Sequence, residues 1–202
     1  MKIVHVETLI SQGSFPQSSE WLKIQNSAFV AVRAADWPPG SGSFTIYPQS
    51  GKKRGQGNGV KPIKNEAISY LRQFGWKINE SWPVGERKRP GNMDAAFFSS
   101  KGIVAFEWET GNISSSHRSM NKMCLGLLTQ KIIAGFLVVP SKKLYPYLTD
   151  RIGNFPELEA YLPLWRATPC NEGILEVIVI EQDAESFEVP KIPKGTDGRA
   201  IY

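Results

Sequence analysis

Three acidic residues, Asp94, Glu107 and Glu109, have a spacing that suits metal chemistry. Residues 93–98 and 102–109 are expected to form antiparallel strands, because a turn-forming Ser-Ser-Lys-Gly sequence separates them. Side chains alternate along a strand, so Glu107 and Glu109 share a face that Asp94 can reach from the partner strand. These carboxylates repel each other unless a cation neutralises them, and all-oxygen sites suit Mg²⁺. The alternative is a solvated sheet face, which is the commoner case for an isolated Glu-X-Glu.

The residues after Glu109 favour a functional site over that alternative. Thr110 and Gly111 end the strand, and the serines from Ser114 onward offer caps for a following helix. Arg118 follows in the same helix. The sequence therefore predicts a polar recognition surface directly beside the metal site.

Length and composition indicate one globular domain. A chain of 202 residues is enough for one well-packed domain, so residues 1–202 are expected to form a single unit. No apolar run approaches the ~20 residues that cross a bilayer, and we expect no membrane association. Two cysteines, Cys124 and Cys170, provide no disulfide framework, which favours the cytoplasm. A net charge of +5 is compatible with nucleic-acid binding but does not establish it.

Hydrophobic periodicity predicts an α/β fold around these residues. Upstream of them we expect a strand at 2–9, a helix at 19–34, a short strand at 44–47 and a helix over 63–74. Downstream we expect a helix at 115–128, a buried central strand at 132–139, helices at 141–148 and 156–165, and a last strand at 174–180. The helix at 115–128 is apolar on more than one side, so one face can pack on the sheet and another on a symmetry mate.

Two basic loops are also candidates for anion binding. Residues 51–59 are rich in glycine and lysine, which is typical of either a mobile solvated loop or a phosphate contact. The spacing does not match a Walker A loop. A second basic loop, residues 86–91, leads into Asp94.

The stretch from Glu107 to Lys122 reads EWETGNISSSHRSMNK and, with Asp94 upstream, resembles the BamHI family of type II restriction endonucleases. Further matching segments occur in the same order: NGVKPIK at 58–64, YLTDR at 147–151, NF at 154–155, ELE at 157–159 and IPKGTDG at 192–198. The resemblance is weak before Trp37.

The resemblance implies a restriction-endonuclease-like PD-(D/E)XK core, with a mixed β-sheet flanked by helices. It implies Asp94, Glu107 and Glu80 as metal ligands, and Glu109 as the base or water-orienting group where that pattern usually has lysine. The spacing to Glu80 differs from the family by one residue, so Asn79 competes for that position.

The resemblance also implies the residues that contact DNA. Those matching major-groove residues of the family are Asn112, Ser114, Arg118, Asp150 and Arg151. Lys64 matches a further DNA contact, and Gly195 and Asp197 belong to a C-terminal arm, residues 189–202, expected near the minor groove. The chemistry agrees, since arginine binds guanine O6 and N7, asparagine reads adenine and aspartate accepts from cytosine N4. A frayed terminus is the alternative for the arm.

The implied activity is Mg²⁺-dependent cleavage of double-stranded DNA at GGATCC after the first G, leaving 5′ overhangs. A palindromic site demands two-fold symmetry, so a homodimer is expected. A nuclease of different specificity and a non-cleaving DNA-binding protein are the alternatives, and the intact acidic residues favour cleavage. His117 could suggest a nuclease with a histidine-metal site, but the only other histidine is His5 and no matching signature is present. His117 is therefore interpreted as a packing or interface residue.

Overall fold

The computed structural model describes residues 1–53, 55–83, 91–149 and 152–194. Four predicted DNA-contacting residues, Asp150, Arg151, Gly195 and Asp197, lie outside the described residues. Most of the basic loop at 86–91 also lies outside them.

A six-stranded mixed sheet forms the centre of the fold, in the order β1-β7-β6-β5-β4-β3. Its strands are β1 Lys2–Gln12, β3 Lys77–Ser81, β4 Asn92–Ser99, β5 Gly102–Trp108, β6 Ala134–Pro140 and β7 Gly173–Glu181. Strands β5, β6 and β7 are parallel, whereas β1, β3 and β4 pair antiparallel with their neighbours. The short strands β2 Thr45–Ile46 and β8 Ala184–Glu185 pair apart from this sheet. The predicted α/β class and mixed sheet are confirmed.

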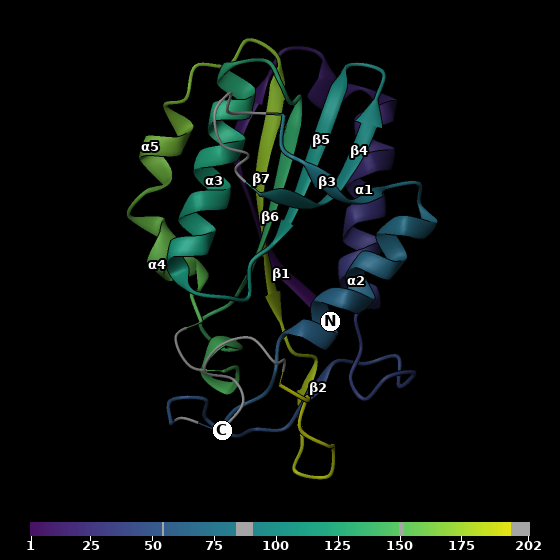
Figure 1. Cartoon of the computed structure of the whole chain (residues 1–202), viewed down its shortest axis with the longest axis vertical. Coiled ribbons are helices and arrows are strands. Elements are labelled where there is room, and N and C mark those ends of the chain that lie inside the picture. The colour runs from purple at the N-terminus through teal and green to yellow at the C-terminus, as the bar shows by residue number, and fades with distance from the viewer. Residues whose placement is uncertain (54, 84–90, 150–151, 195–202) are drawn as a thin grey trace.

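Helices cover both faces of the sheet (Figure 1). One face carries α1 Ser19–Ala34 and α2 Lys61–Gln73. The other carries α3 Ile113–Leu128, α4 Phe155–Glu159 and α5 Leu162–Arg166. Within the described part of the chain, no helix has the length and apolar character needed to cross a bilayer.

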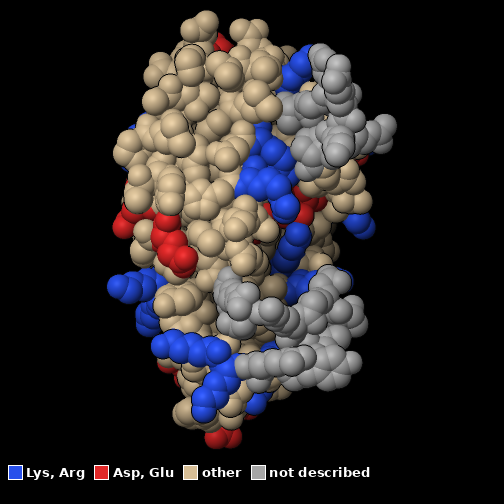
Figure 2. Space-filling model, turned by 60° about the vertical axis from the view of Figure 1, so that its left-hand side comes forward, with Lys and Arg blue, Asp and Glu red and all other residues tan. Residues whose placement is uncertain are grey.

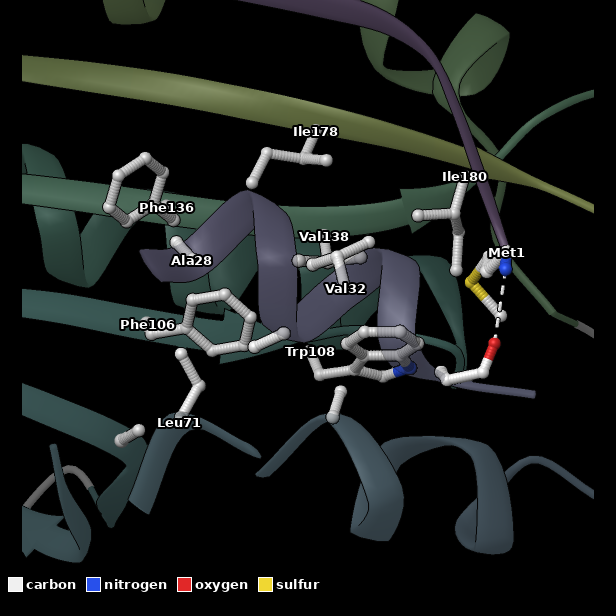
Figure 3. Close-up of a cluster of buried hydrophobic side chains, with 14 of the residues drawn as sticks. Met1, Ala28, Val32, Leu71, Phe106, Trp108, Phe136, Val138, Ile178 and Ile180 are labelled. Atoms are coloured by element: carbon white, nitrogen blue, oxygen red, sulfur yellow. Dashed lines mark hydrogen bonds between the residues drawn. The ribbon is translucent and has the colours of Figure 1, made fainter. Parts of the chain in front are cut away.

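The core under α1 and α2 is built around Phe136 of β6 (Figure 3). Trp21 of α1 stacks on Phe136 at a centroid distance of 5.1 Å, and Phe106 and Trp76 also contact its ring. Helix α1 begins as predicted, since the Ser18 side chain accepts a hydrogen bond from the Trp21 amide at 3.0 Å. Local capping and an apolar stripe therefore explain why the predicted bounds of α1 match the observed ones.

The core on the opposite face is built from α3, α4 and α5. Met120, Met123 and Leu127 of α3 are buried against the sheet there. Every residue of β6 is buried, which confirms the central strand predicted from its continuous apolar sequence.

Two helix predictions are wrong, and proline explains much of both. Instead of a helix over 141–148, the structure has only the 3₁₀ turn Tyr145–Tyr147, because Pro146 lacks an amide and Ser141 Oγ accepts from two nearby amides. The helix predicted over 156–165 is divided into α4 and α5, and Pro163 stands in the first turn of the second.

Two apolar residues at helix ends are exposed, although helical periodicity would turn them inward. Phe74 is the C-cap of α2, and Leu128 is the last residue of α3. Both residues stand at the end of a helix. The apolar periodicity of the helix continues there, but the sheet surface on which the helix packs does not.

Replacing Phe136 with alanine should destabilise the fold by about 3–5 kcal/mol, because it removes the ring that several aromatic neighbours contact. The matched control is Phe98→Ala, since Phe98 lies on β4 but is 55% exposed. That control should change stability by less than about 1 kcal/mol. Urea denaturation measures both, and equal losses would contradict this account of the core.

Candidate active site

Strands β4 and β5 bring two of the predicted carboxylates together. Their register pairs Ala95 with Phe106, and continuing it places Asp94 opposite Glu107. Asp94 Oδ2 also accepts a hydrogen bond from the Trp108 amide at 2.8 Å, which fixes the aspartate against β5. The predicted hairpin and the predicted shared face are both confirmed.

Glu107 is buried and held by two donors. Its Oε1 accepts hydrogen bonds from Trp82 Nε1 at 2.9 Å and from Lys122 Nζ at 3.1 Å. Burial, reinforced by the charge of Asp94, raises the pKa of Glu107 to about 7, although the Lys122 ammonium opposes this shift. Glu107 is therefore poised between its neutral and charged forms near neutral pH.

Glu109 follows β5 directly and enters the same pocket. Its Oε1 accepts a hydrogen bond from the Ser119 hydroxyl at 2.7 Å. Burial raises the pKa of Glu109, and Asp94 adds to the shift, whereas Lys64 and Arg118 oppose it. A carboxylate with a raised pKa is a better proton acceptor, which suits the predicted role of a base.

Lys64 reaches Asp94 from α2, which lies on the face of the sheet opposite to α3. Its Nζ lies 2.5 Å from Asp94 Oδ1. The residue that the family match predicted to contact DNA therefore contacts the acidic group itself in this structure.

A hollow of about 510 Å³ unites these groups. Its lining residues are Lys64, Gly91, Asn92, Asp94, Glu107, Trp108, Glu109, Arg118, Ser119 and Lys122. On the face drawn in Figure 2, lysine and arginine side chains border a small group of acidic ones. A carboxylate centre surrounded by cations is suited to a phosphate ester whose negative charge needs neutralising.

The structure does not bring Glu80 into this hollow. Glu80 pairs with Met93 on β4, and Asn79 occupies the position opposite Asp94. Asn79 has a left-handed backbone with φ of 61°, so the strand alternation is interrupted at this point. The assignment of the fourth acidic position to Glu80, with Asn79 as the alternative, stays a prediction.

The oxygen ligands at this site suit a hard divalent cation, but the three carboxylates are not yet close enough together to bind one. Asp94, Glu107 and Glu109 offer only oxygen atoms, as Mg²⁺ prefers. Among the described residues, no three acidic, histidine or cysteine side chains are close enough together to hold a metal. Each of the three carboxylates instead accepts a contact from a lysine, tryptophan, serine or backbone amide. Metal binding therefore requires some of these contacts to rearrange.

The predicted recognition residues at the start of α3 are exposed beside the hollow. Asn112, rather than a serine as predicted, caps α3, because its Oδ1 accepts from the Ser114 amide at 2.9 Å. Arg118 lies on the rim of the hollow. Asn112 also forms a bridge with Ile152, so the chain that follows Arg151 runs alongside the start of α3. Ile152 therefore lies beside the predicted recognition residue Asn112.

Sequence reasoning missed Trp82 and Lys122, which both hold Glu107. The Lys122 ammonium also lies 4.8 Å from the centroid of the Trp82 ring. One signal was present in the sequence: Arg118 and Lys122 are four residues apart, so they share a face of the helix that follows the acidic strand. Nothing in the spacing identified Trp82.

Comparisons with known proteins found a matching family model and two similar relatives. The family model for restriction endonuclease BamHI matches residues 1–199. The chain is 45% identical to type II restriction enzyme OkrAI of Oceanobacter kriegii over the full length of both proteins. It is 37% identical to type II restriction enzyme BamHI of Bacillus amyloliquefaciens, covering 86% of this chain and 80% of that one.

A solved structure supports the fold independently. The crystal structure of restriction endonuclease BglII complexed with a DNA 16-mer matches with a TM-score of 0.53 at 11% identity. The match covers 90% of this chain and 79% of the BglII chain. At this identity the likeness concerns the fold alone, and it confirms the restriction-endonuclease-like core.

The raised pKa of Glu107 predicts a pH-dependent stability in metal-free buffer. The folded chain holds this proton more tightly than the unfolded chain, so the stabilisation is complete below about pH 4.5 and is lost as pH rises through about 7. Glu107→Gln cannot ionise, so its stability relative to wild type should increase between pH 5 and pH 8, by at most about 3 kcal/mol.

Thermal melts in EDTA at several pH values test this prediction. Glu159→Gln is the control, because Glu159 is an exposed glutamate on α4. A pH dependence of Glu107→Gln identical to that of Glu159→Gln would show that burial of Glu107 does not control its protonation.

Proposed function

Because this chain belongs to the BamHI family of restriction endonucleases, we propose that it cleaves double-stranded DNA at GGATCC after the first G, with Mg²⁺. The chain is a type II site-specific deoxyribonuclease, and DNA is its partner. Enzymes of this family generally use a divalent metal. The observation that carries the proposal is the hollow in which Asp94, Glu107 and Glu109 meet beneath a rim of lysine and arginine.

Phosphodiester hydrolysis needs an activated water, neutralisation of charge on the phosphate and help for the leaving oxygen. Asp94 and Glu107 would hold Mg²⁺, which supplies a Lewis acid and lowers the pKa of water, and Glu80 stays a proposed further ligand. Glu109 orients the attacking water and accepts its proton. Lys64 adds positive charge to the same side of the hollow.

Sequence readout is proposed for the residues that match the family. On α3 these are Asn112, Ser114 and Arg118, and outside the described residues they are Asp150, Arg151, Gly195 and Asp197. Arg118 and Arg151 suit guanine, whereas Asp150 suits cytosine. Asn112 Oδ1 accepts one hydrogen bond in the α3 cap, and its second lone pair can still accept from a base. A bidentate contact to adenine is therefore compatible with the cap.

A homodimer is proposed because a palindrome presents the same half-site twice, related by a two-fold axis. Helices α3 and α5 offer a suitable surface, since Leu125, Leu128 and Leu164 are exposed apolar residues. Tyr161 packs edge-on against His117 at 4.5 Å between these helices, consistent with the interpretation of His117 as a packing or interface residue. Isologous contact of this surface with its copy would cover the exposed leucines.

The proposed location is the cytoplasm. Cys124 and Cys170 are both free thiols in this structure, as expected of a protein kept in a reducing compartment.

Cleavage of a plasmid with a single GGATCC site tests the proposed function. With Mg²⁺ the enzyme should produce linear DNA whose sequenced ends carry the 5′ overhang GATC, and a plasmid without the site should remain supercoiled. Cleavage at other sequences would indicate a nuclease of different specificity, and binding without cleavage would indicate a DNA-binding protein.

Asp94→Ala and Glu107→Ala should each lower the cleavage rate by orders of magnitude, because each removes a carboxylate from the hollow. Both should still bind GGATCC when Ca²⁺ replaces Mg²⁺. Glu159→Ala on α4 is the control and should cleave normally. Near wild-type cleavage by either site variant would refute the assignment of the site.

Disrupting the α3 surface should produce a monomer with little cleavage activity. Leu128→Glu places a charge on a side chain that is 51% exposed at the end of α3, where contact with a copy would bury it. Leu22→Glu on α1 is the control, because Leu22 is 56% exposed on the opposite helical layer. Sedimentation velocity measures the oligomeric state, and a Leu128→Glu dimer as stable as wild type would exclude this surface.

A further inference from the structure

Asn58 is a fully buried polar residue in the glycine-rich loop, with a side chain that is 0% exposed. Its Nδ2 donates to the carbonyls of Tyr47 and Tyr147, at 2.8 and 2.9 Å. Its Oδ1 accepts from the Ile192 amide at 3.1 Å. One side-chain amide therefore joins three segments that are far apart in the sequence.

The backbone of Asn58 adds two more hydrogen bonds to one of those segments. Its amide donates to the Tyr147 carbonyl at 2.8 Å, and its carbonyl accepts from the Thr149 amide at 2.9 Å. These bonds form a parallel bridge between Asn58 and Leu148. We call this set of contacts, from Asn58 to residues 47, 147–149 and 192, the Asn58 junction.

The glycines around Asn58 allow the junction to close. A Cβ on Gly51 would lie 1.5 Å from the Leu148 carbonyl oxygen, and one on Gly59 would lie 2.0 Å from the Pro193 carbonyl oxygen. The Gly59 amide also donates to the Ile192 carbonyl at 2.9 Å. Glycine is thus needed here because protein backbones approach each other closely.

The segments that meet at the junction lead directly to predicted DNA contacts. Residues 147–149 run into Asp150 and Arg151, and residues 192–194 run into Gly195 and Asp197. On its other side, Asn58 precedes α2, which carries Lys64 to Asp94.

We propose that Asn58 is a positioning residue for sequence discrimination, which holds residues 147–149 and Ile192, from which the chain continues to the predicted DNA contacts. This inference rests on the proposed function. Asn58 itself touches no DNA, since its side chain is buried and fully hydrogen-bonded. Its loss should therefore displace several base-contacting residues together while leaving the carboxylates of the hollow in place.

The decisive substitution is Asn58→Asp, which keeps the shape and the acceptor for Ile192. An aspartate cannot donate to the Tyr47 and Tyr147 carbonyls, so two oxygen atoms would face its carboxylate without a proton between them. Asn58→Ala removes all three side-chain bonds. Gly59→Ala is a second variant aimed at the arm, because its Cβ would lie 2.0 Å from the Pro193 carbonyl oxygen and leaves the side chain of Asn58 intact.

Discrimination is measured as the ratio of affinities for GGATCC and its single-base variants, in Ca²⁺ and well below each melting temperature. Asn58→Asp and Asn58→Ala should lose about tenfold or more of this ratio at the guanine positions. Gly59→Ala should lose less. The cleavage rate on saturating GGATCC with Mg²⁺ should fall less than the discrimination does.

Ser27→Ala is the matched control, because it also removes a buried side-chain hydrogen bond. Ser27 accepts from Trp76 Nε1 at 3.0 Å in the core, away from the junction. It should lower the melting temperature without changing discrimination. If folded Asn58 variants, or Gly59→Ala where those fail to fold, discriminate as well as wild type, the inference is wrong.

The wild-type enzyme separates this outcome from failure of the proposed function. If wild type shows no sequence-dependent binding or cleavage, the proposed function has failed, and the positioning role fails with it. If wild type discriminates and the junction variants discriminate equally well, only the role of Asn58 is refuted.

Discussion

Burial of the Glu107 carboxylate is the constraint on which the arrangement of the active site depends. A buried carboxylate is costly unless donors reach it, and Glu107 receives them from Trp82 after β3 and from Lys122 on α3. These donors come from two elements, the segment after β3 and helix α3, so the sheet edge and the helical layer must both be in place. The raised pKa of Glu107 indicates that the donors compensate for burial only in part. A divalent cation would supply the remaining compensation.

Both helical layers contribute a cation to the same group of carboxylates. Lys122 comes from α3, and Lys64 comes from α2 on the opposite face of the sheet. This is possible because the carboxylates stand at the carboxyl end of β5, where the two layers approach each other beyond the strand. Open α/β sheets bind their ligands at the carboxyl ends of strands for the same reason. Lys64 thus places a positive charge close enough to Glu109 to oppose the rise in its pKa.

Local signals determined how much of this molecule the sequence predicted. Helix α1 and the β4–β5 hairpin were predicted well, because caps, turns and alternation are encoded within a few residues. The helix at 141–148 failed where a proline and a serine side chain compete with helical hydrogen bonds. Trp82 was missed because its role arises from the burial of Glu107, a property of the assembled fold. The spacing of Asp94, Glu107 and Glu109 predicted that these carboxylates meet, as they do in one hollow, but not which groups hold them.

In the glycine-rich loop, the composition suggested that backbone amides would bind phosphate, whereas several of them bind protein oxygen atoms. Its glycines and lysines suggested amides that approach a phosphate, yet the amides of Gly51, Gly57 and Gly59 all donate to protein oxygen atoms. Among the described residues of this loop, Lys52 and Lys53 have exposed basic side chains that a phosphate could contact. Such contacts would contribute affinity that is independent of sequence. The backbone of the loop, by contrast, holds residues 147–149 and Ile192 through Asn58 and its neighbouring glycines.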